Sequence, residues 1–293
     1  MSVLSEMNKA EQRIRAKEVF TVVDADGQIR EDVKVITPEM KEAYKKRTEL
    51  EAYKNRTDNP FTIVNMEASK EVTAIEELNT KELGYFLILQ SYVDYSNMIK
   101  KANTTLPMTE KEIGEALKLK DKRAYSKVIE KFITLGLMYK ESVTLYSKEY
   151  QAFFVDKKYC FRGSNRSDKV VKMFITSVQE LYNQDGIKPA DIGFLFMVLP
   201  YMHYESNHLV KHPYERDYAK AEAISQKDIV EITGLDEKKV KKHLKMKLSG
   251  VHVFATFRAG RNSVYKVNPS LFFRGVMPDE KLKADFILTG QSL

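Results

Sequence analysis

The sequence predicts a mainly helical α+β protein in which one unit occurs twice after an N-terminal extension. The segment YKVNPSLFFRG, which ends at Gly275, is echoed by FFVDKKYCFRG, which ends at Gly163. Further upstream, ELGYFLILQSYVDY from Glu82 matches DIGFLFMVLPYMHY from Asp191 in its acidic, glycine and aromatic positions. Helix caps and hairpin patterns recur in the same order between these ends. A unit of about 85 residues is therefore expected twice.

These observations give the following organisation. We expect an N-terminal extension over residues 1–59, a first domain over 60–163, a linker over 164–186, a second domain over 187–275 and a C-terminal tail over 276–293. Within the extension, Asp26–Gly27 predicts a β-hairpin and Pro38 begins a charged helix. We expect no chemistry from this segment.

Each unit begins with a strongly apolar helix. It is expected from Thr80 to Tyr95 in the first copy and from Pro189 to Tyr204 in the second. Asn79 supplies an N-cap in the first copy, and proline suits the first helical turn in the second.

A helix-turn-helix pattern follows in both copies. Thr109-x-x-Glu112 and Ser225-x-x-Asp228 have the spacing of capping boxes, which predicts a short second helix. In the second copy, Gly234 ends that helix and Asp236 begins the next one after a tight turn.

The third helix of each copy is followed by a predicted hairpin. Val240, Leu244 and Leu248 form an apolar stripe in the second copy, and Ala124, Val128 and Phe132 form one in the first. Two β-rich runs then flank residues 259–262, and a weaker pair flanks a turn near Ser147. Three helices and a hairpin predict tandem winged helix-turn-helix domains.

The outward side of the third helix is basic, as an interface with nucleic acid requires. In the second copy the candidate DNA-binding residues are Lys238, Lys239, Lys241, Lys242, His243 and Lys245, joined by Arg258, Arg261 and Asn262 of the hairpin. In the first copy they are Lys118, Lys120, Lys122, Arg123, Ser126 and Lys127. The residues of the first copy are less basic and more varied in type than those of the second copy. The third helix of the first copy therefore either reads bases or packs against another surface.

The motifs resemble a known family. PYMHYESNHL, ISQKDIVEITGLDEKKVKKHL and VYKVNPSLFFRG are similar to segments of the winged-helix replication proteins of Firmicute plasmids and phages, often called RepL-type. The resemblance implies a winged-helix fold and DNA binding. The first copy departs from it, because Asp156–Lys157 replaces Asn268–Pro269, and the family does not usually carry two modules in tandem. In both copies, the arginine of Phe-Arg-Gly is expected to meet a phosphate or to cap backbone carbonyls of a neighbouring helix.

The sequence gives little support for an enzyme. The five histidines lie at positions 203, 208, 212, 243 and 252, and they never form the His-hydrophobic-His triplet of a rolling-circle nicking enzyme. No phosphate-binding loop occurs among the twelve glycines. The histidines between 203 and 212 lack cysteine partners for zinc, and Cys160 is expected in the core. We therefore expect neither catalysis, nor a metal, nor a cofactor.

Composition agrees with a polyanion as partner. The chain carries a net charge of +7; residues 1–78 hold 13 Lys and Arg against 16 Asp and Glu, which leaves 35 against 25 in the remainder. The basic excess thus belongs to the repeated part. With one cysteine, no leader at the start and no apolar run long enough to span a bilayer, the chain is expected in the cytoplasm and away from membranes.

We therefore expect a protein that binds double-stranded DNA in a sequence-specific way. The first hypothesis for its role is a plasmid or phage replication initiator that binds origin repeats. Two alternatives stay open: a plasmid or phage transcriptional regulator, and a winged-helix scaffold that binds proteins. Replication proteins, transcription proteins and a second copy of the chain are the candidate protein partners.

Overall fold

The computed structural model describes residues 60–163, 167–217, 220–259, 262–276, 278 and 280–288, together with Pro38, Lys41, Glu42, Tyr44 and Lys45. The chain divides into two compact units, residues 1–58 and 59–293. In the first unit the five described residues are helical, as the predicted helix from Pro38 requires, whereas the predicted hairpin at Asp26–Gly27 lies outside the described residues. All that follows concerns the second unit.

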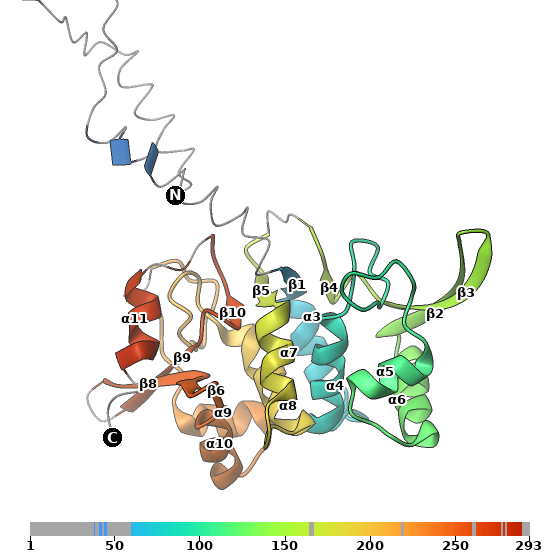
Figure 1. The fold of residues 1–293 in the computed structure, drawn as a ribbon. Coiled ribbons are helices and arrows are strands. Elements are labelled where there is room, and N and C mark those ends of the chain that lie inside the picture. Colours follow the sequence, from blue (N-terminus) through green and yellow to red (C-terminus); the bar gives the residue numbers. More distant parts are fainter. Residues whose placement is uncertain are drawn as a thin grey trace, which may run out of the picture. The chain divides into compact units, whose positions relative to one another are not determined.

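The second unit is a mixed α and β structure in which the same order of elements occurs twice (Figure 1). The first half contains β1 (Phe61–Asn65), α3 (Met66–Thr73), α4 (Thr80–Gln90), α5 (Glu110–Ala116), α6 (Lys122–Thr134), β2 (Met138–Leu145), β3 (Lys148–Val155) and β4 (Cys160–Phe161). The second half contains β5 (Val170–Phe174), α7 (Ile175–Asn183), α8 (Pro189–Val198), η1 (Leu199–Tyr201), α9 (Gln226–Thr233), α10 (Glu237–Leu244), β6 (Lys247–Leu248), β7 (Val251–His252), β8 (Phe254–Ala259), β9 (Asn262–Val267) and β10 (Phe272–Phe273).

Two of the predicted boundaries are wrong. The segment 164–186, expected to be a linker, contains β5 and α7, which correspond to β1 and α3 of the first half. The repeated unit is therefore longer than predicted. The tail 276–293 contains a further helix, α11 (Glu280–Leu288), which has no counterpart in the first half.

One antiparallel sheet joins the two halves, with the strand order β10-β5-β1-β4. Phe61 pairs with Phe174 and Asn65 with Val170, so Ile63 lies opposite Lys172 at the centre. Each outer strand pairs with the first strand of its own half. The strands β1 and β5 occupy equivalent places in the two halves and run antiparallel, with their middle residues Ile63 and Lys172 paired. A local two-fold axis therefore relates the two halves at this point.

The first long helices of the two halves, α4 and α8, cross at glycines. A Cβ atom added to Gly84 would lie 1.8 Å from the carbonyl oxygen of Pro189, and one added to Gly193 would lie 1.7 Å from that of Thr80. Any side chain here would overlap the opposite backbone. The two glycines that the repeat aligns therefore meet at the local two-fold axis.

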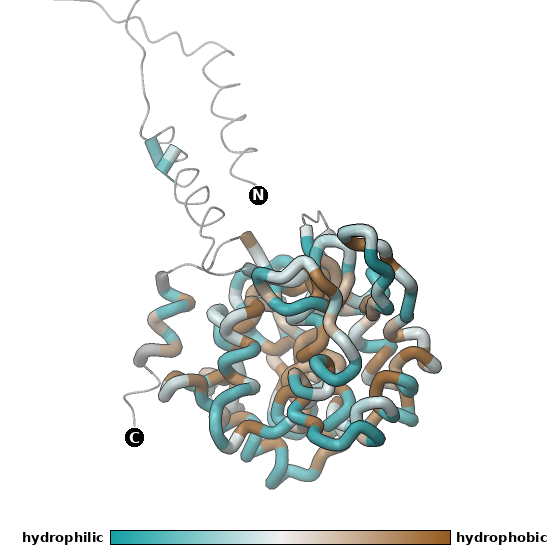
Figure 2. The backbone as a smooth tube through the Cα atoms, turned by 45° about the vertical axis from the view of Figure 1, so that its right-hand side comes forward, coloured by the Kyte–Doolittle hydropathy of each residue, from teal (hydrophilic) through white to brown (hydrophobic). Residues whose placement is uncertain are grey.

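The core is continuous across both halves (Figure 2). Phe86 on α4 contacts Phe196 on α8 edge-to-face, with ring centroids 5.9 Å apart. Both helices are buried on nearly all sides, which explains why their sequences are apolar without a polar stripe. Within the described part, no helix is both long and apolar enough to cross a membrane.

The predicted caps are confirmed. Capping boxes begin α4 at Asn79, α5 at Thr109 and α9 at Ser225, and Pro189 occupies the first turn of α8. Gly234 ends α9 with a left-handed φ of 64°. Both apolar helices end earlier than predicted, α4 at Gln90 and α8 at Val198.

Candidate nucleic-acid interface

The α10 helix presents a row of lysines to solvent. It begins at Asp236, whose side chain accepts a hydrogen bond of 2.9 Å from the backbone of Lys239. Val240 and Leu244 face the core, as predicted, whereas Leu248 lies beyond the helix in β6. The five exposed lysines are Lys238, Lys239, Lys241, Lys242 and Lys245.

Two of these lysines are paired within their own helix. Lys239 lies 2.9 Å from Asp236 and Lys241 lies 2.7 Å from Glu237. Lys238, Lys242 and Lys245 form no ion pair among the described residues, although Lys242 is near enough to Asp191 to help lower the pKa of that carboxyl. These three cations are therefore the ones that α10 offers to an external anion.

His243 was expected on the exposed edge of this face, and that prediction is wrong. Its side chain is buried, its Nδ1 lies 2.8 Å from Oδ1 of Asp191, and its ring stacks on Phe194 at 4.8 Å. Burial raises the pKa of Asp191, but hydrogen bonds from His243 and the backbone of Lys188 outweigh it and lower that pKa. His243 thus fixes α10 against α8 and is not available to DNA.

The α6 helix carries the corresponding face of the first half. Lys120, Lys122, Arg123 and Lys127 are exposed, and Ser126 is half-buried with its hydroxyl 3.4 Å from a Glu110 carboxylate oxygen.

The predicted apolar stripe of α6 is correct at Phe132 but shifted by one residue at its other two positions. Tyr125, Ile129 and Phe132 are buried, whereas Ala124 and Val128 are only partly covered. Apolar residues occupy adjacent positions on this helix, and the packing of Tyr125 against Gly114 of α5 selects one of the two possible stripes.

Lys118 connects the two halves. It has a left-handed φ of 58°, and its ammonium donates to the carbonyl of Tyr182 at 2.5 Å and lies 4.5 Å from the centre of that ring. The Tyr182 hydroxyl donates in return to the carbonyl of Leu117 at 2.8 Å. We therefore remove Lys118 from the candidate DNA contacts.

The hairpin residues are only partly described. Arg258 is exposed on β8, and Asn262 begins β9 opposite Ala259. Arg261 lies outside the described residues. The predicted hairpin itself is confirmed.

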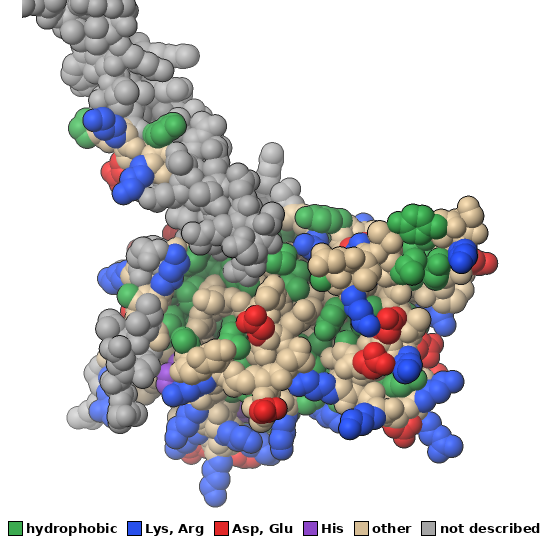
Figure 3. Space-filling model, in the orientation of Figure 1, with side chains coloured by type: hydrophobic (Ala, Val, Ile, Leu, Met, Phe, Trp, Pro, Cys, Tyr) green, Lys and Arg blue, Asp and Glu red, His purple; other side chains and the backbone are tan. Residues whose placement is uncertain are grey.

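The basic residues gather at one end of the unit. In Figure 3, Lys and Arg side chains follow the lower edge, over the α9–α10 and α5–α6 pairs. An acidic residue near the start of each long helix ties it to the third helix: Glu82 lies 2.7 Å from Lys131 of α6, and Asp191 holds His243 of α10. The crossing of α4 and α8 therefore sets the separation of the two basic helices.

Two buried asparagines, which were not predicted, close the hairpins. Asn97 donates from its amide to the carbonyls of Val155 (2.9 Å) and Cys160 (2.6 Å). Asn207 donates to those of Val267 (3.0 Å) and Phe272 (2.7 Å), which are the equivalent positions. Both asparagines have positive φ angles. Their occurrence just after Tyr-x-x-Tyr in both copies is the signal that could have revealed them.

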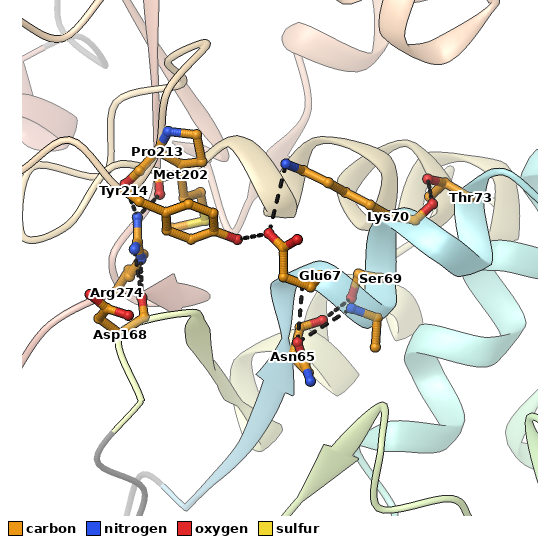
Figure 4. A network of polar contacts seen from close by, with 11 residues as sticks. Asn65, Glu67, Ser69, Lys70, Thr73, Asp168, Met202, Pro213, Tyr214 and Arg274 are labelled. Atoms are coloured by element: carbon orange, nitrogen blue, oxygen red, sulfur yellow. Dashed lines mark hydrogen bonds and ion pairs between the residues drawn. The ribbon is translucent and has the colours of Figure 1, made fainter.

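Arg274 of the second Phe-Arg-Gly motif is buried in a polar network (Figure 4). Its guanidinium donates to the carbonyls of Asp168, Met202 and Pro213 and lies over the ring of Tyr214. The arginine therefore binds backbone carbonyls rather than capping a neighbouring α-helix as expected, because two of the three carbonyls belong to loops and the third to the residue that ends η1. Its counterpart, Arg162, lies 4.9 Å from the ring centre of Tyr95.

Tyr214 extends the network to the other half of the unit. Its hydroxyl donates to the carboxylate of Glu67 on α3 (Figure 4), and this hydrogen bond lowers the pKa of Glu67.

No metal centre occurs in the described part of the chain, where no three His, Cys, Asp or Glu side chains converge. His203 is bound instead to the Ser206 hydroxyl and the Glu215 carbonyl, each at 2.8 Å. Cys160 is buried, and its burial raises the pKa of the thiol. In comparisons with known proteins, no family model matches the chain, and no curated protein or solved structure is significantly similar to it.

Proposed function

We propose that the chain binds double-stranded DNA through two winged-helix modules. In each half, two helices, a tight turn, a third helix and a hairpin follow one another, which is the order of elements in a winged helix. In that fold the third helix enters the major groove and the hairpin contacts the backbone.

One observation carries this proposal: two basic third helices occupy the same end of a unit with a local two-fold axis. Lys238, Lys242 and Lys245 on α10 form no ion pair in the described part, so no acidic side chain there competes with phosphates for them at ion-pair distance. In dimeric helix-turn-helix proteins, a symmetric pair of such helices binds two major-groove segments about one helical turn apart, and we assign the same role to α6 and α10.

Replication initiation at origin repeats is the role we place first, because the VYKVNPSLFFRG ending resembles RepL-type replication proteins. Transcriptional regulation would use the same surfaces. Selection of bound fragments from the genome that encodes the protein separates the two roles. Fragments from an origin support initiation, fragments from promoters support regulation, and the absence of any enriched fragment favours a protein-binding scaffold.

The proposed face is tested by Lys238→Ala combined with Lys242→Ala. We expect weaker binding to every DNA sequence and a log–log salt slope that is smaller by about 1.8, because each phosphate contact contributes about 0.9. Specificity should change little, since phosphates carry no base information. Titration of labelled duplexes of different sequence at salt concentrations between about 50 and 200 mM measures both the affinity for each sequence and the salt slope.

The matched control is Lys157→Ala combined with Lys169→Ala. These exposed lysines precede β4 and β5, at the end of the unit opposite to α10 in Figure 1, and their removal changes the net charge equally. If both double variants lose the same affinity, only net charge matters and α10 is not the binding face.

A further inference from the structure

The hairpins of the two halves differ in what covers their outer faces. In the second half, α11 lies beside β8–β9 (Figure 1), and Asp285 of α11 lies 2.5 Å from Lys266 of β9. Leu282 and Phe286 of α11 are buried. The outer face of this hairpin is therefore covered by the chain's own last helix.

In the described part of the chain, no helix follows β4 in the way that α11 follows β10. Only residues 162–169 separate β4 from β5, which is too short for a helix and its connections. The pair Met138↔Val155 in β2–β3 is equivalent to the pair Phe254↔Val267 in β8–β9. The next pair toward the tip is Tyr139↔Phe154 in the first hairpin, where the second hairpin has Ala255↔Lys266. This face, termed the β2–β3 outer face, consists of Tyr139, Glu141, Val143, Leu145, Lys148, Tyr150, Ala152 and Phe154. At its base, Ala152 and Phe154 are buried with Met98 in a small cluster of the chain's own, so the accessible part of the face is the half toward the tip.

The β2–β3 outer face is mainly apolar. Tyr139 and Phe154 stack at its base with ring centroids 5.1 Å apart, and Val143 lies opposite Tyr150 at its middle. At the tip, Tyr146 has 73% of its surface exposed. Figure 3 shows hydrophobic side chains gathered over this hairpin. Such a face on a projecting hairpin indicates a docking surface.

Two opposite charges flank the apolar middle of this face. On this face, Glu141 belongs to the pair next to Val143↔Tyr150 on the side of the base, and Lys148 belongs to the pair next to it on the side of the tip. Neither forms an ion pair within the described residues. Because their signs differ and their distances from the middle pair are equal, reversal of the hairpin direction brings each charge close to its opposite.

We propose that the β2–β3 outer face binds the same face of a second copy of the chain, with the two hairpins antiparallel. A two-fold axis through the middle pairs then stacks Val143 and Tyr150 on their equivalents and places Lys148 of each copy beside Glu141 of the other. A parallel arrangement would instead place like charges together.

The size of the face sets the expected strength. One hairpin face on each copy buries less than the roughly 1,600 Å² of a standard interface. Association in the micromolar range is therefore expected, so the full-length chain should be a reversible monomer–dimer mixture in the absence of DNA. This inference does not depend on DNA binding.

Sedimentation velocity of the full-length chain from about 1 to 100 μM, the range expected for so small an interface, tests the proposal. Glu141→Lys alone and Lys148→Glu alone should each weaken dimerisation roughly tenfold, because each turns two attractive pairs into repulsive ones. The combined variant should return to within about threefold of the parent, since it restores both pairs with their signs exchanged.

The matched control is Glu149→Lys, which makes the same charge change on the opposite face of the hairpin and should leave dimerisation unchanged. Far-UV circular dichroism verifies that every variant is folded. A parent chain that stays monomeric at 100 μM, or a combined variant no better than the single ones, overturns the proposal. Single variants that alter DNA affinity but not self-association overturn it too, and identify the hairpin as a DNA contact.

Discussion

Asn97 and Asn207 perform the same task in the two halves, and their removal should be costly. Each amide binds two buried backbone carbonyls, which an alanine would leave without partners. We expect Asn97→Ala or Asn207→Ala to lower the free energy of unfolding by about 2–4 kcal/mol, as measured by urea denaturation. Asn103→Ala is the control, because Asn103 also has a positive φ but is exposed. A loss as large in the control would assign the cost to backbone conformation alone.

His208 should make the stability depend on pH. Burial, together with Lys266 and His203, lowers its pKa to about 3, whereas an unfolded histidine has a pKa of about 6.5. As pH falls through this interval, only the unfolded chain takes up the proton, so the free energy of unfolding decreases.

The comparison with His208→Gln isolates this effect. With both proteins normalised at pH 7.5, the parent should lose about 2 kcal/mol more than the variant by pH 5. Urea denaturation at each pH supplies the values. Parallel curves for the two proteins would contradict a buried neutral His208.

Single residues were predictable from the sequence only where their role is local. Asp236 and Gly234 were identified correctly because capping depends on the adjacent backbone. His243 was placed wrongly, because its partner Asp191 is 52 positions away and no local pattern reveals that contact. Asn97 was overlooked because an asparagine in a polar loop is ordinary turn chemistry.

Among the elements, helices with strong caps were predicted well and short strands were not. The strand β5 has five residues, and its pairing with β1 joins segments more than a hundred positions apart, so it was included in a linker. The stripe of α6 was shifted because two apolar rows lie side by side on that helix. Tertiary packing, which the sequence does not display, decided between them.

The crossing of α4 and α8 should tolerate no side chain. We expect Gly84→Ala or Gly193→Ala to destabilise the unit by about 3 kcal/mol or more, although alanine normally stabilises a helix, because the opposite carbonyl lies within 2 Å of the added carbon. Thermal denaturation measures the change. Glu130→Ala, on the exposed side of α6, is the control. A more stable Gly84→Ala variant would show that the helices do not approach this closely.

At the scale of the whole unit, the two third helices are related by symmetry but differ in sequence. Under the proposed function, one chain should protect two major-groove segments about 10 base pairs apart, with unrelated half-site sequences. The exposed Lys238 and Lys242 of α10 correspond to Arg123 and Lys127 of α6 when the helices are aligned at their N-caps. Footprinting with titrated protein measures this spacing. A palindrome contacted only by the second half of two chains would contradict it and leave α6 without a DNA role.

The pairing of β1 with β5 also has a consequence for synthesis on the ribosome. Asn65 leaves the exit tunnel 105 residues before its partner Val170. At about 5–20 residues per second, β1 and the apolar surface of α4 wait roughly 5–20 s for the strand and helix that cover them. During that interval the nascent first half has an open sheet edge, and two such halves on neighbouring ribosomes can pair β1 with β1 in the register that β5 later takes. Crowded translation of one message should therefore favour entanglement of nascent chains, and chaperones that shield the first half should raise the yield of correctly folded protein.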